Sequence, residues 1–143
     1  MKISIVCYQK NRNEELGAAE REYIKRLSRQ ASVEICPISK WKDGDVLPER
    51  LVKGAHLVGL YIEGQSFSSE KLARHIQGLM NQGRSHLVLV IGAAEGMPRG
   101  VEAQLVERWS LSSLTFSHQI VRLLVLEVLY RSFDIMGGGR YHK

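Results

Sequence analysis

Cysteine is scarce in this chain. Its 143 residues include two cysteines, Cys7 and Cys36, and both lie in strand-like runs. In a reducing compartment, two thiols at this spacing are best explained as buried free thiols, so no disulfide is expected. The five histidines include no pair with zinc-ligand spacing and a third ligand nearby. We therefore expect no metal site.

Long apolar runs are also missing. No run is long enough to span a membrane. The first residues, 1–6, lack the long apolar region and cleavage site of a signal peptide and predict a strand instead. Repeats, low-complexity segments and linkers are absent as well. We expect one domain, residues 1–143, in the cytoplasm.

The chain has no dense run of basic residues. Twenty Lys and Arg against fifteen Asp and Glu give a formal net charge of +5, but the basic residues are spread along the sequence. A positive balance favours a polyanionic partner. The charge therefore supports RNA binding weakly.

Apolar runs alternate with amphipathic segments along the whole chain. This pattern predicts an α/β fold, with one mainly parallel sheet covered by helices on both faces. The expected strands are 3–8, 33–38, 57–62, 87–91 and 110–114. The expected helices are 13–28, 47–53, 68–81, 100–108 and 119–133, with Ser68 as an N-cap.

Two apolar runs end in loops of small residues. Residues 87–91 stop at Gly92-Ala93-Ala94-Glu95-Gly96, and residues 109–116 are rich in serine. Such loops lie at the edge where open α/β sheets bind ligands. The glycines of 92–100 match neither the dinucleotide motif nor the phosphate loop, which disfavours NAD and ATP. A nucleoside ligand without phosphate fits better, and ordinary turn glycines are the alternative.

The serine-rich segment has two interpretations. Ser110, Ser112, Ser113 and Thr115 alternate imperfectly with apolar residues. The segment is either a half-buried edge strand, or a loop whose backbone pairs with an adenine edge while Leu111 and Leu114 enclose the ring. No catalytic triad is visible, because His118 is near the serines but lacks a third partner. His118 itself is either a helix cap or a catalytic group.

The last predicted helix is unusually apolar. Ten of the fifteen residues in 119–133 are apolar, which is too wide a stripe for a helix with its back in water. A second buried face favours an isologous homodimer through this helix, in which Leu126 and Leu129 are interface candidates. The alternative is a helix wholly buried inside the monomer.

The C-terminal tail follows three glycines, 137–139. Arg140, Tyr141, His142 and Lys143 offer a cation, a stacking ring and a titratable base, which are the groups needed to hold an RNA base. A solvated, disordered end is the alternative.

These segments together resemble one family. The resemblance is carried by VIGAAEG (90–96), WSLSSLT (109–115), His118, Gln119, Val121, Arg122, Leu129, Tyr130, Arg131 and the terminal Tyr141-His142-Lys143. This ordered series is similar to the RlmH-type (YbeA-like) SPOUT methyltransferases, and residues 1–3 and 60–64 extend the similarity more weakly. Enzymes of this family methylate N3 of a pseudouridine in large-subunit ribosomal RNA with S-adenosylmethionine.

The resemblance implies a C-terminal trefoil knot and a homodimer with the last helix in the interface. Carried over by position, it implies that S-adenosylmethionine contacts Leu60, Gly92, Leu111, Ser112, Ser113, Leu114, Thr115 and Phe116. For the chemistry we expect His142 to be the general base and Tyr141 to stack on the RNA base. Arg140 and Arg131 are candidates to stabilise the developing anion or to hold phosphate.

Two departures from the family pattern motivate rival functions. Ala93 stands where the family usually has glycine, and Gly138-Gly139-Arg140 precede Tyr141 where the family commonly has Asn-x-Pro. One rival is a non-catalytic RNA-binding dimer of the same fold. The other is a related SPOUT enzyme that acts on transfer RNA.

Overall fold

One parallel sheet organises the computed structural model, which describes residues 1–10 and 14–142. Its strands are β1 (Lys2–Tyr8), β2 (Ser32–Ile38), β3 (His56–Ser66), β4 (His86–Ile91) and β5 (Glu107–Ser110). They are ordered β2-β1-β4-β3-β5, and every pairing is parallel. The predicted α/β fold with a mainly parallel sheet is confirmed, and the trefoil knot stays a prediction.

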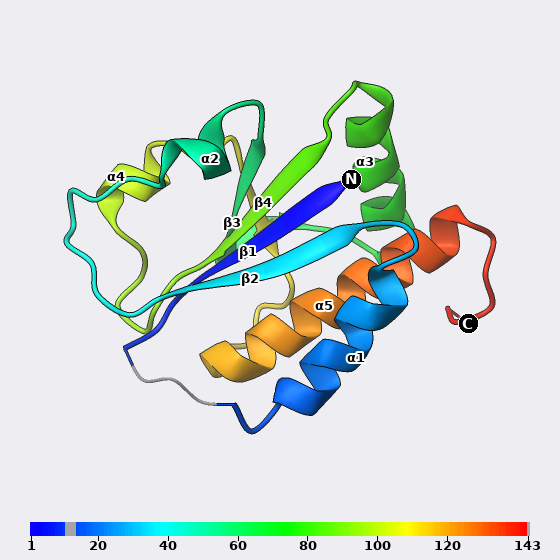
Figure 1. Cartoon of the computed structure of the whole chain (residues 1–143), viewed down its shortest axis with the longest axis horizontal. Helices are drawn as coiled ribbons and strands as arrows, with labels where there is room; N and C mark the ends of the chain where they lie inside the picture. The colour runs from blue at the N-terminus through cyan, green and yellow to red at the C-terminus, as the bar shows by residue number, and fades with distance from the viewer. Residues whose placement is uncertain (11–13, 143) are drawn as a thin grey trace.

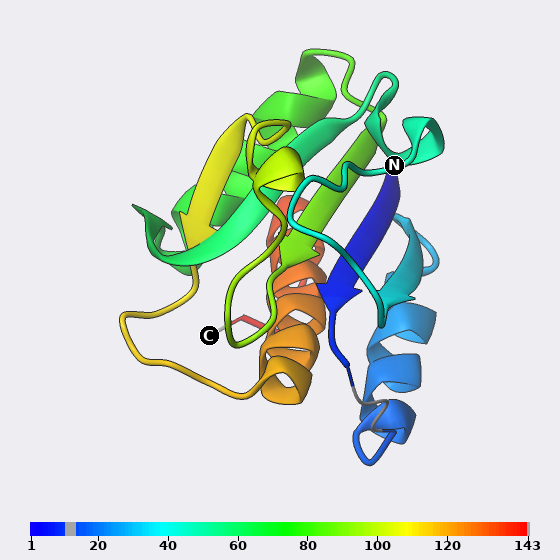
Figure 2. The same cartoon turned by 90° about the vertical axis from the view of Figure 1, so that its left-hand side faces the viewer.

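Helices cover both faces of this sheet (Figures 1 and 2). The long helices are α1 (Gly17–Leu27), α3 (Ser69–Asn81) and α5 (His118–Met136), and the short ones are α2 (Glu49–Val52) and α4 (Arg99–Glu102). Ser68 caps α3 as predicted, because its Oγ accepts the amide of Lys71 at 3.2 Å. No helix in the described ranges is long and apolar enough to cross a membrane.

Strand alternation divides the interior into two cores. Ile3 and Ile5 of β1 pack with the apolar residues of α1, α3 and α5. Val6 and Tyr8 point to the other face and pack with those of α2 and α4. Successive side chains of a strand point to opposite faces, so each strand residue contributes to one core.

Helix α5 lies on the sheet between α1 and α3 and contacts β1 and β4 as well. Leu126 and Leu129 are fully buried in the core of the protomer, so they are not the interface residues that the sequence pattern suggested. The outer side of α5 carries Ile120, which is 45% exposed, and the half-buried Leu123 and Leu124. The helix is therefore not wholly buried inside the monomer.

Two expected elements are wrong near residue 105. The expected helix 100–108 ends at Glu102 in the structure, and the expected strand 110–114 is a loop that follows β5. The strand lies earlier because β5 pairs with β3 and buries Trp109. The start of the expected helix at Asn13 lies outside the described residues, and α1 begins at Gly17.

Both cysteines are free, as predicted. Cys7 is buried on β1, and Cys36 is half-buried on β2. Burial raises the pKa of Cys7 to about 12, so this group remains a thiol at neutral pH. Neither cysteine lines the cavity described next.

Candidate active site

A cavity of about 840 Å³ opens at the carboxyl edge of the sheet. Its walls come from residues 60–63 in the middle of β3, the end of β4 with the loop 92–97, Glu102 of α4, the loop 111–117 after β5 and the first turn of α5. Figure 2 shows both loops beside the N-terminal end of α5. Loops at this edge of a parallel sheet are the usual place for a ligand. The cavity is therefore our candidate cofactor site.

The structure brings most of the expected cofactor residues together. The cavity is lined by Leu60, Gly92, Leu111, Ser112, Leu114, Thr115 and Phe116. Ser113 is exposed and is not part of the wall. Tyr61 and Glu102 also line the cavity, and neither was predicted as a site residue from the sequence. Strand alternation alone did not show which side chains of 61–63 face the cavity.

The loop after β4 closes tightly on itself. Ala93 and Gly96 exchange two backbone hydrogen bonds, of 2.9 and 2.8 Å. Gly96 has a φ of +100°, a conformation that favours glycine. A Cβ at Gly92 would lie 3.0 Å from the carbonyl carbon of Gly96. A side chain at position 92 would therefore crowd the loop's own backbone, which would have to shift by a few tenths of an ångström.

The loop 111–117 forms hydrogen bonds within itself. The Oγ of Ser110 donates to the carbonyl of Ser112 at 3.1 Å, and the amide of Leu114 donates to the Oγ of Ser112 at 3.0 Å. Leu111 is half-buried against the core, whereas Leu114 is 67% exposed. The edge-strand interpretation is wrong, and the adenine contacts of the loop interpretation stay a prediction.

The charged side chains on the cavity wall are acidic. Glu63, Glu95 and Glu102 line it, and none of its described lining residues is lysine or arginine. Tyr61 donates a 2.7 Å hydrogen bond to Glu102, and burial together with this carboxylate raises the pKa of Tyr61 to about 12. A cavity without cations is poorly suited to phosphate and suits a neutral or cationic ligand.

His118 sits where the cavity meets the first turn of α5. It lines the cavity and is half-buried. The N-cap of α5 is Ser117, whose side chain makes no capping hydrogen bond. His118 is therefore not the cap, and its position leaves it beside the ligand space.

The C-terminal residues form a second polar site. Arg131 Nη1 lies 2.9 Å from His142 Nδ1, and the Arg131 guanidinium lies 4.8 Å from the centre of the Tyr141 ring. The ring of Tyr141 also packs edge-on against Tyr130, with centroids 4.7 Å apart. Arg140 is exposed, and Lys143 lies outside the described residues. The structure thus brings together Arg131, Tyr141 and His142, so this tail is not a solvated end.

Tyr141 is fixed as a neutral phenol. Its hydroxyl lies 3.4 Å from that of Tyr23, and this contact, with burial and Glu127, raises the pKa of Tyr141 to about 12. Its amide donates to Asp134 at 2.9 Å. Tyr141 can therefore stack or donate a hydrogen bond at neutral pH, but it is not a base.

The two sites lie at opposite ends of α5. The cavity includes His118, at the first residue of the helix, while the tail follows Met136, its last residue (Figure 1). The tail folds back onto α5, where His142 contacts Arg131. A helix rises 1.5 Å per residue, so the stretch from His118 to Arg131 separates the two sites by roughly 20 Å along the axis. Within one protomer, the tail residues do not line the cavity.

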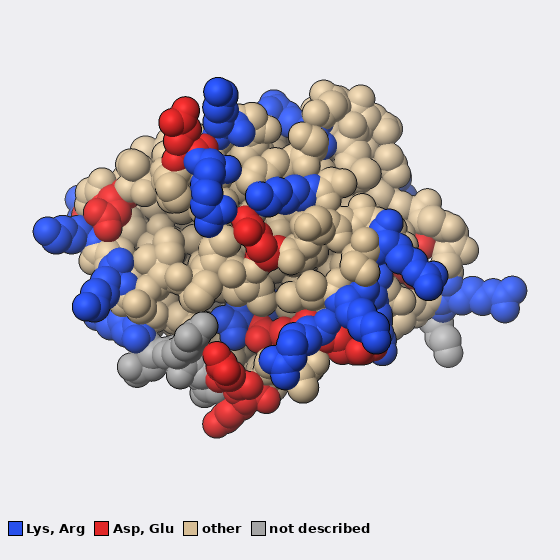
Figure 3. All heavy atoms as spheres, viewed as in Figure 1, with Lys and Arg blue, Asp and Glu red and all other residues tan. Residues whose placement is uncertain are grey.

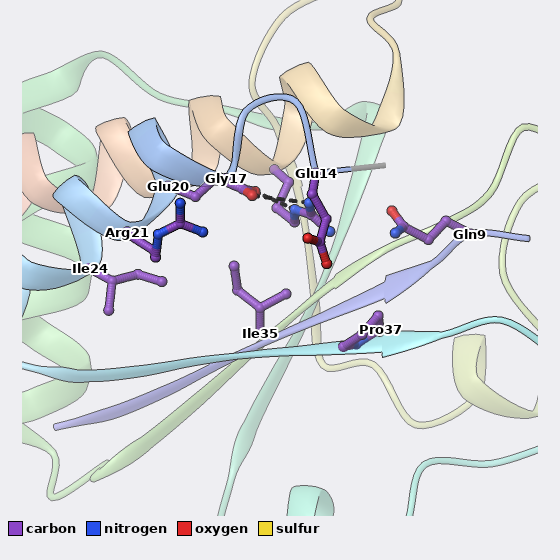
Figure 4. A pocket seen from close by; sticks show the side chains of 9 residues that line it. Gln9, Glu14, Gly17, Glu20, Arg21, Ile24, Ile35 and Pro37 are labelled. Atoms are coloured by element: carbon purple, nitrogen blue, oxygen red, sulfur yellow. Dashed lines mark hydrogen bonds and ion pairs between the residues drawn. The ribbon is translucent and has the colours of Figure 1, made fainter. Parts of the chain in front are cut away.

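A smaller cavity of about 230 Å³ lies between α1 and β2, and Arg122 of α5 also lines it (Figure 4). At its base, Arg122 of α5 pairs with Glu20 of α1, and one of the two hydrogen bonds measures 3.0 Å. Both side chains are buried. A buried pair fixes relative position, because separating the partners leaves an uncompensated charge. Arg122 therefore anchors the start of α5.

Strand β5 is anchored by the half-buried carboxylate of Glu107. Glu107 accepts from Trp109 Nε1 at 3.1 Å and pairs with His75 at 2.8 Å and with His56. Burial alone would raise its pKa, but the hydrogen bonds from His56 and Trp109 outweigh burial and lower it. In the described part of the chain, no group of three His, Cys, Asp or Glu is arranged to hold a metal ion.

Basic side chains form no single patch on the face of the described residues that Figure 3 shows. On the face drawn in Figure 3, Lys and Arg are spread over the molecule, with acidic side chains between them. Several basic residues are paired, including Arg50 with Glu34 and Arg26 with Glu22. Charge alone therefore does not locate an RNA surface.

Comparison with known proteins identifies the family. The family described as "Predicted SPOUT methyltransferase" matches residues 1–142. A protein of Acetivibrio thermocellus named ribosomal RNA large subunit methyltransferase H is 35% identical over 159 aligned positions, which cover the whole of both chains. Proteins of the same name from Desulforamulus reducens and Bacillus pumilus are 36% and 33% identical, over 100% of this chain and 99% and 100% of theirs.

A solved structure agrees in fold. It is described as a "probable methylase family protein" of Haemophilus influenzae and matches with a TM-score of 0.57 at 12% identity. The match covers 95% of this chain and 66% of that one. Likeness at this identity concerns the fold alone. The family match and the full-length relatives show that this chain belongs to the SPOUT methyltransferases, which use S-adenosylmethionine as methyl donor.

Proposed function

We propose that this enzyme transfers a methyl group from S-adenosylmethionine to N3 of a pseudouridine in large-subunit ribosomal RNA. The observation that carries the proposal is the cavity at the carboxyl edge, which is lined by the two loops that match the family. Full-length relatives named for activity on the large-subunit RNA support the substrate class. A ribosomal substrate places the activity in the cytoplasm.

The cavity fits this cofactor in size and charge. S-adenosylmethionine carries a sulfonium, an ammonium and a carboxylate, so it is a net cation without phosphate. Three carboxylates and no basic side chain line the described wall. We assign Leu60, Gly92 and residues 111–116 to cofactor contacts, with Leu111 and Leu114 against the adenine ring. Ser113 would contribute through its backbone, since its side chain is not in the wall.

The bound cofactor supplies an electrophilic methyl group. The N3 imide proton of the pseudouridine passes to His142, and the nitrogen forms a bond to the methyl carbon as the carbon–sulfur bond breaks. Arg131 or Arg140 stabilises the anion that develops on the base, and Tyr141 stacks on the ring. Much of the acceleration comes from alignment of nucleophile, methyl and leaving group.

A homodimer explains how tail and cavity meet. The tail residues pack against Arg131, roughly 20 Å along α5 from His118 at the cavity of the same protomer. A two-fold axis that pairs α5 antiparallel with its copy places the tail of one protomer near the cavity of the other. Ile120, Leu123 and Leu124 provide an apolar outer side for this contact.

The decisive experiment tests the purified protein on both candidate substrates, ribosomes and transfer RNA. Ribosomes and transfer RNA from a strain that lacks the gene are incubated with labelled S-adenosylmethionine. Mass spectrometry of the RNA then locates the methyl group. The proposal is supported if N3-methylated pseudouridine appears in large-subunit RNA after the incubation and is missing from the same RNA before it. Methylated transfer RNA, or cofactor binding with no methyl transfer to either RNA, contradicts it.

A further inference from the structure

Both ring nitrogens of His142 are engaged by charged side chains. Arg131 Nη1, on α5, lies 2.9 Å from Nδ1, and Glu70 Oε1, in the first turn of α3, lies 2.8 Å from Nε2. The His142 side chain is 23% exposed. The ring of His142 is thus held between side chains of α5 and α3, two helices that pack against each other.

The donor and acceptor chemistry assigns the proton. A guanidinium can only donate, so Nδ1 must be the acceptor in the contact with Arg131. Nε2 then carries the hydrogen and donates it to Glu70. The hydrogen bond from His142 lowers the pKa of Glu70, so this carboxyl is ionised at neutral pH and accepts.

Arg131 is itself held in place. Its Nε donates to Glu127 Oε1 at 2.9 Å, and its Nη2 lies 2.6 Å from the same atom. The hydrogen bond to Glu127 raises the pKa of Arg131 above its ordinary value. The guanidinium therefore stays charged and presents Nη1 to His142.

We propose that Glu70 is a positioning residue that holds His142 as the neutral Nε2–H tautomer, with Nδ1 as the nitrogen that takes the substrate proton. This inference rests on the proposed function, in which His142 is the base. Arg131 covers Nδ1 in the free protein and must release it when the RNA base arrives. Arg131 is then free to pair with the anion that forms on the base.

The arrangement also supports the step that follows. When Nδ1 takes the imide proton, the ring becomes an imidazolium whose Nε2–H already points at the Glu70 carboxylate. The new positive charge is thus formed next to a fixed negative charge, without further movement. In hydrolases a carboxylate that orients a histidine plays a comparable part, although the Glu70 side chain is 53% exposed whereas the acid of the hydrolases is buried.

The tautomer is read directly by nitrogen NMR of histidine-labelled protein at mildly alkaline pH. The His142 signals are assigned by their loss in His142→Ala. We expect an unprotonated Nδ1 and a protonated Nε2. A dominant Nδ1–H form, or an equal mixture of the two, would overturn the proposal whether or not the enzyme acts on ribosomes.

The role of Glu70 is read from methyl transfer to ribosomes. Glu70→Ala should lower kcat about 10- to 100-fold with little change in KM, and Glu70→Gln, which keeps an acceptor oxygen, should recover part of this loss. In a His142→Ala background, Glu70→Ala should have no further effect, because it acts through that ring. Glu49→Ala, which removes a first-turn glutamate from α2, is the matched control.

Two kinetic results contradict the inference while the proposed function survives. One is wild-type activity in Glu70→Ala when His142→Ala is impaired. The other is an equal loss from Glu70→Ala in both backgrounds, which would show a structural effect. If wild-type protein fails to methylate ribosomes, the proposed function is wrong, and the NMR measurement still decides the tautomer.

Discussion

The two ends of α5 are built in opposite ways. At the N-terminal end, loops enclose an open cavity of about 840 Å³. Among the described residues that line it there are glutamates but no lysine or arginine. At the C-terminal end, Arg131, Tyr141 and His142 are already closed into hydrogen bonds and ring contacts. One end is shaped for a ligand that enters, and the other is a network of side chains that is complete without one.

This contrast separates two requirements of methyl transfer. A cofactor site needs volume, which the cavity at the carboxyl edge of the sheet provides. A proton acceptor needs a fixed orientation, which charged neighbours on two helices provide. Because the requirements lie at different ends of one helix, variants at either end should affect one property and leave the other intact.

The largest effect is expected from removal of the tail. A chain that ends at Met136 should lose about 1000-fold in methyl transfer to ribosomes, since it lacks the proposed base, His142, and the proposed stacking ring, Tyr141. Its affinity for S-adenosylmethionine, measured by calorimetry, should stay within about threefold of wild type. The tail contacts Tyr130 and Asp134, so we expect a stability loss of about 1 kcal/mol.

Loss of cofactor affinity in the truncated protein would break the contrast. So would full activity, which would assign the chemistry to the cavity residues alone. The single variant His142→Ala tests the same end more finely. It should reduce the rate and flatten its rise with pH if this side chain takes the proton.

The next effect concerns the cavity end. Thr115→Trp should lower the affinity for S-adenosylmethionine about 100-fold, because a large ring fills space that Thr115 now lines. Ser113→Trp is the matched control, since Ser113 is exposed in the same loop but outside the wall. Calorimetry on both variants, with circular dichroism to confirm folding, distinguishes the two positions. Equal affinities would place the cofactor elsewhere.

Much of the fold and one end of the site could be predicted from the sequence. Strands β1 and β4 are recognisable as apolar runs. The small residues of the loop at Gly92 predict a ligand site at the carboxyl edge of the sheet. The predicted strand 110–114 was wrong, because alternation of serine and leucine also occurs in a loop that forms hydrogen bonds within itself, as around Ser112. The strand that forms instead is β5, which pairs with β3 and buries Trp109.

Contacts between distant residues could not be predicted. Glu70 and His142 are 72 positions apart, and Glu20 and Arg122 are 102 apart. Nothing in the local pattern of either glutamate distinguishes it from a solvated helix charge. The burial of Leu126 and Leu129 inside the protomer could not be predicted either, since an apolar stripe on a helix can be covered by the protein's own core or by a partner.

The dimer proposal predicts different outcomes for two neighbouring leucines. Leu124→Glu should dissociate the dimer while the protomer stays folded, because Leu124 is half-exposed on the outer side of α5. Leu126→Glu should unfold the protomer at a cost of about 4 kcal/mol, since Leu126 is 0% exposed in the core. Light scattering and thermal unfolding measure the two effects. A wild-type monomer at micromolar concentration would contradict the dimer itself.

The smallest effect tests whether the cavity end depends on how β5 is anchored. Glu107→Gln should cost about 1 to 2 kcal/mol of unfolding free energy at neutral pH, because the carboxylate holds His56, His75 and Trp109. The pKa of Glu107 is below its ordinary value of 4.5 in the folded state. Its contribution is therefore present above that value and is lost as the pH falls through the lowered folded pKa.

The stability difference between wild type and Glu107→Gln, measured by denaturation, should thus shrink in acid. Glu49→Gln, which removes a carboxylate from the short helix α2, is measured alongside as the control. Cofactor affinity should change by less than about threefold, since Glu107 is outside the cavity wall. A difference that grows in acid would contradict the lowered pKa. A large loss of affinity would show that the anchor of β5, rather than the loop 111–117 itself, determines the shape of the cavity.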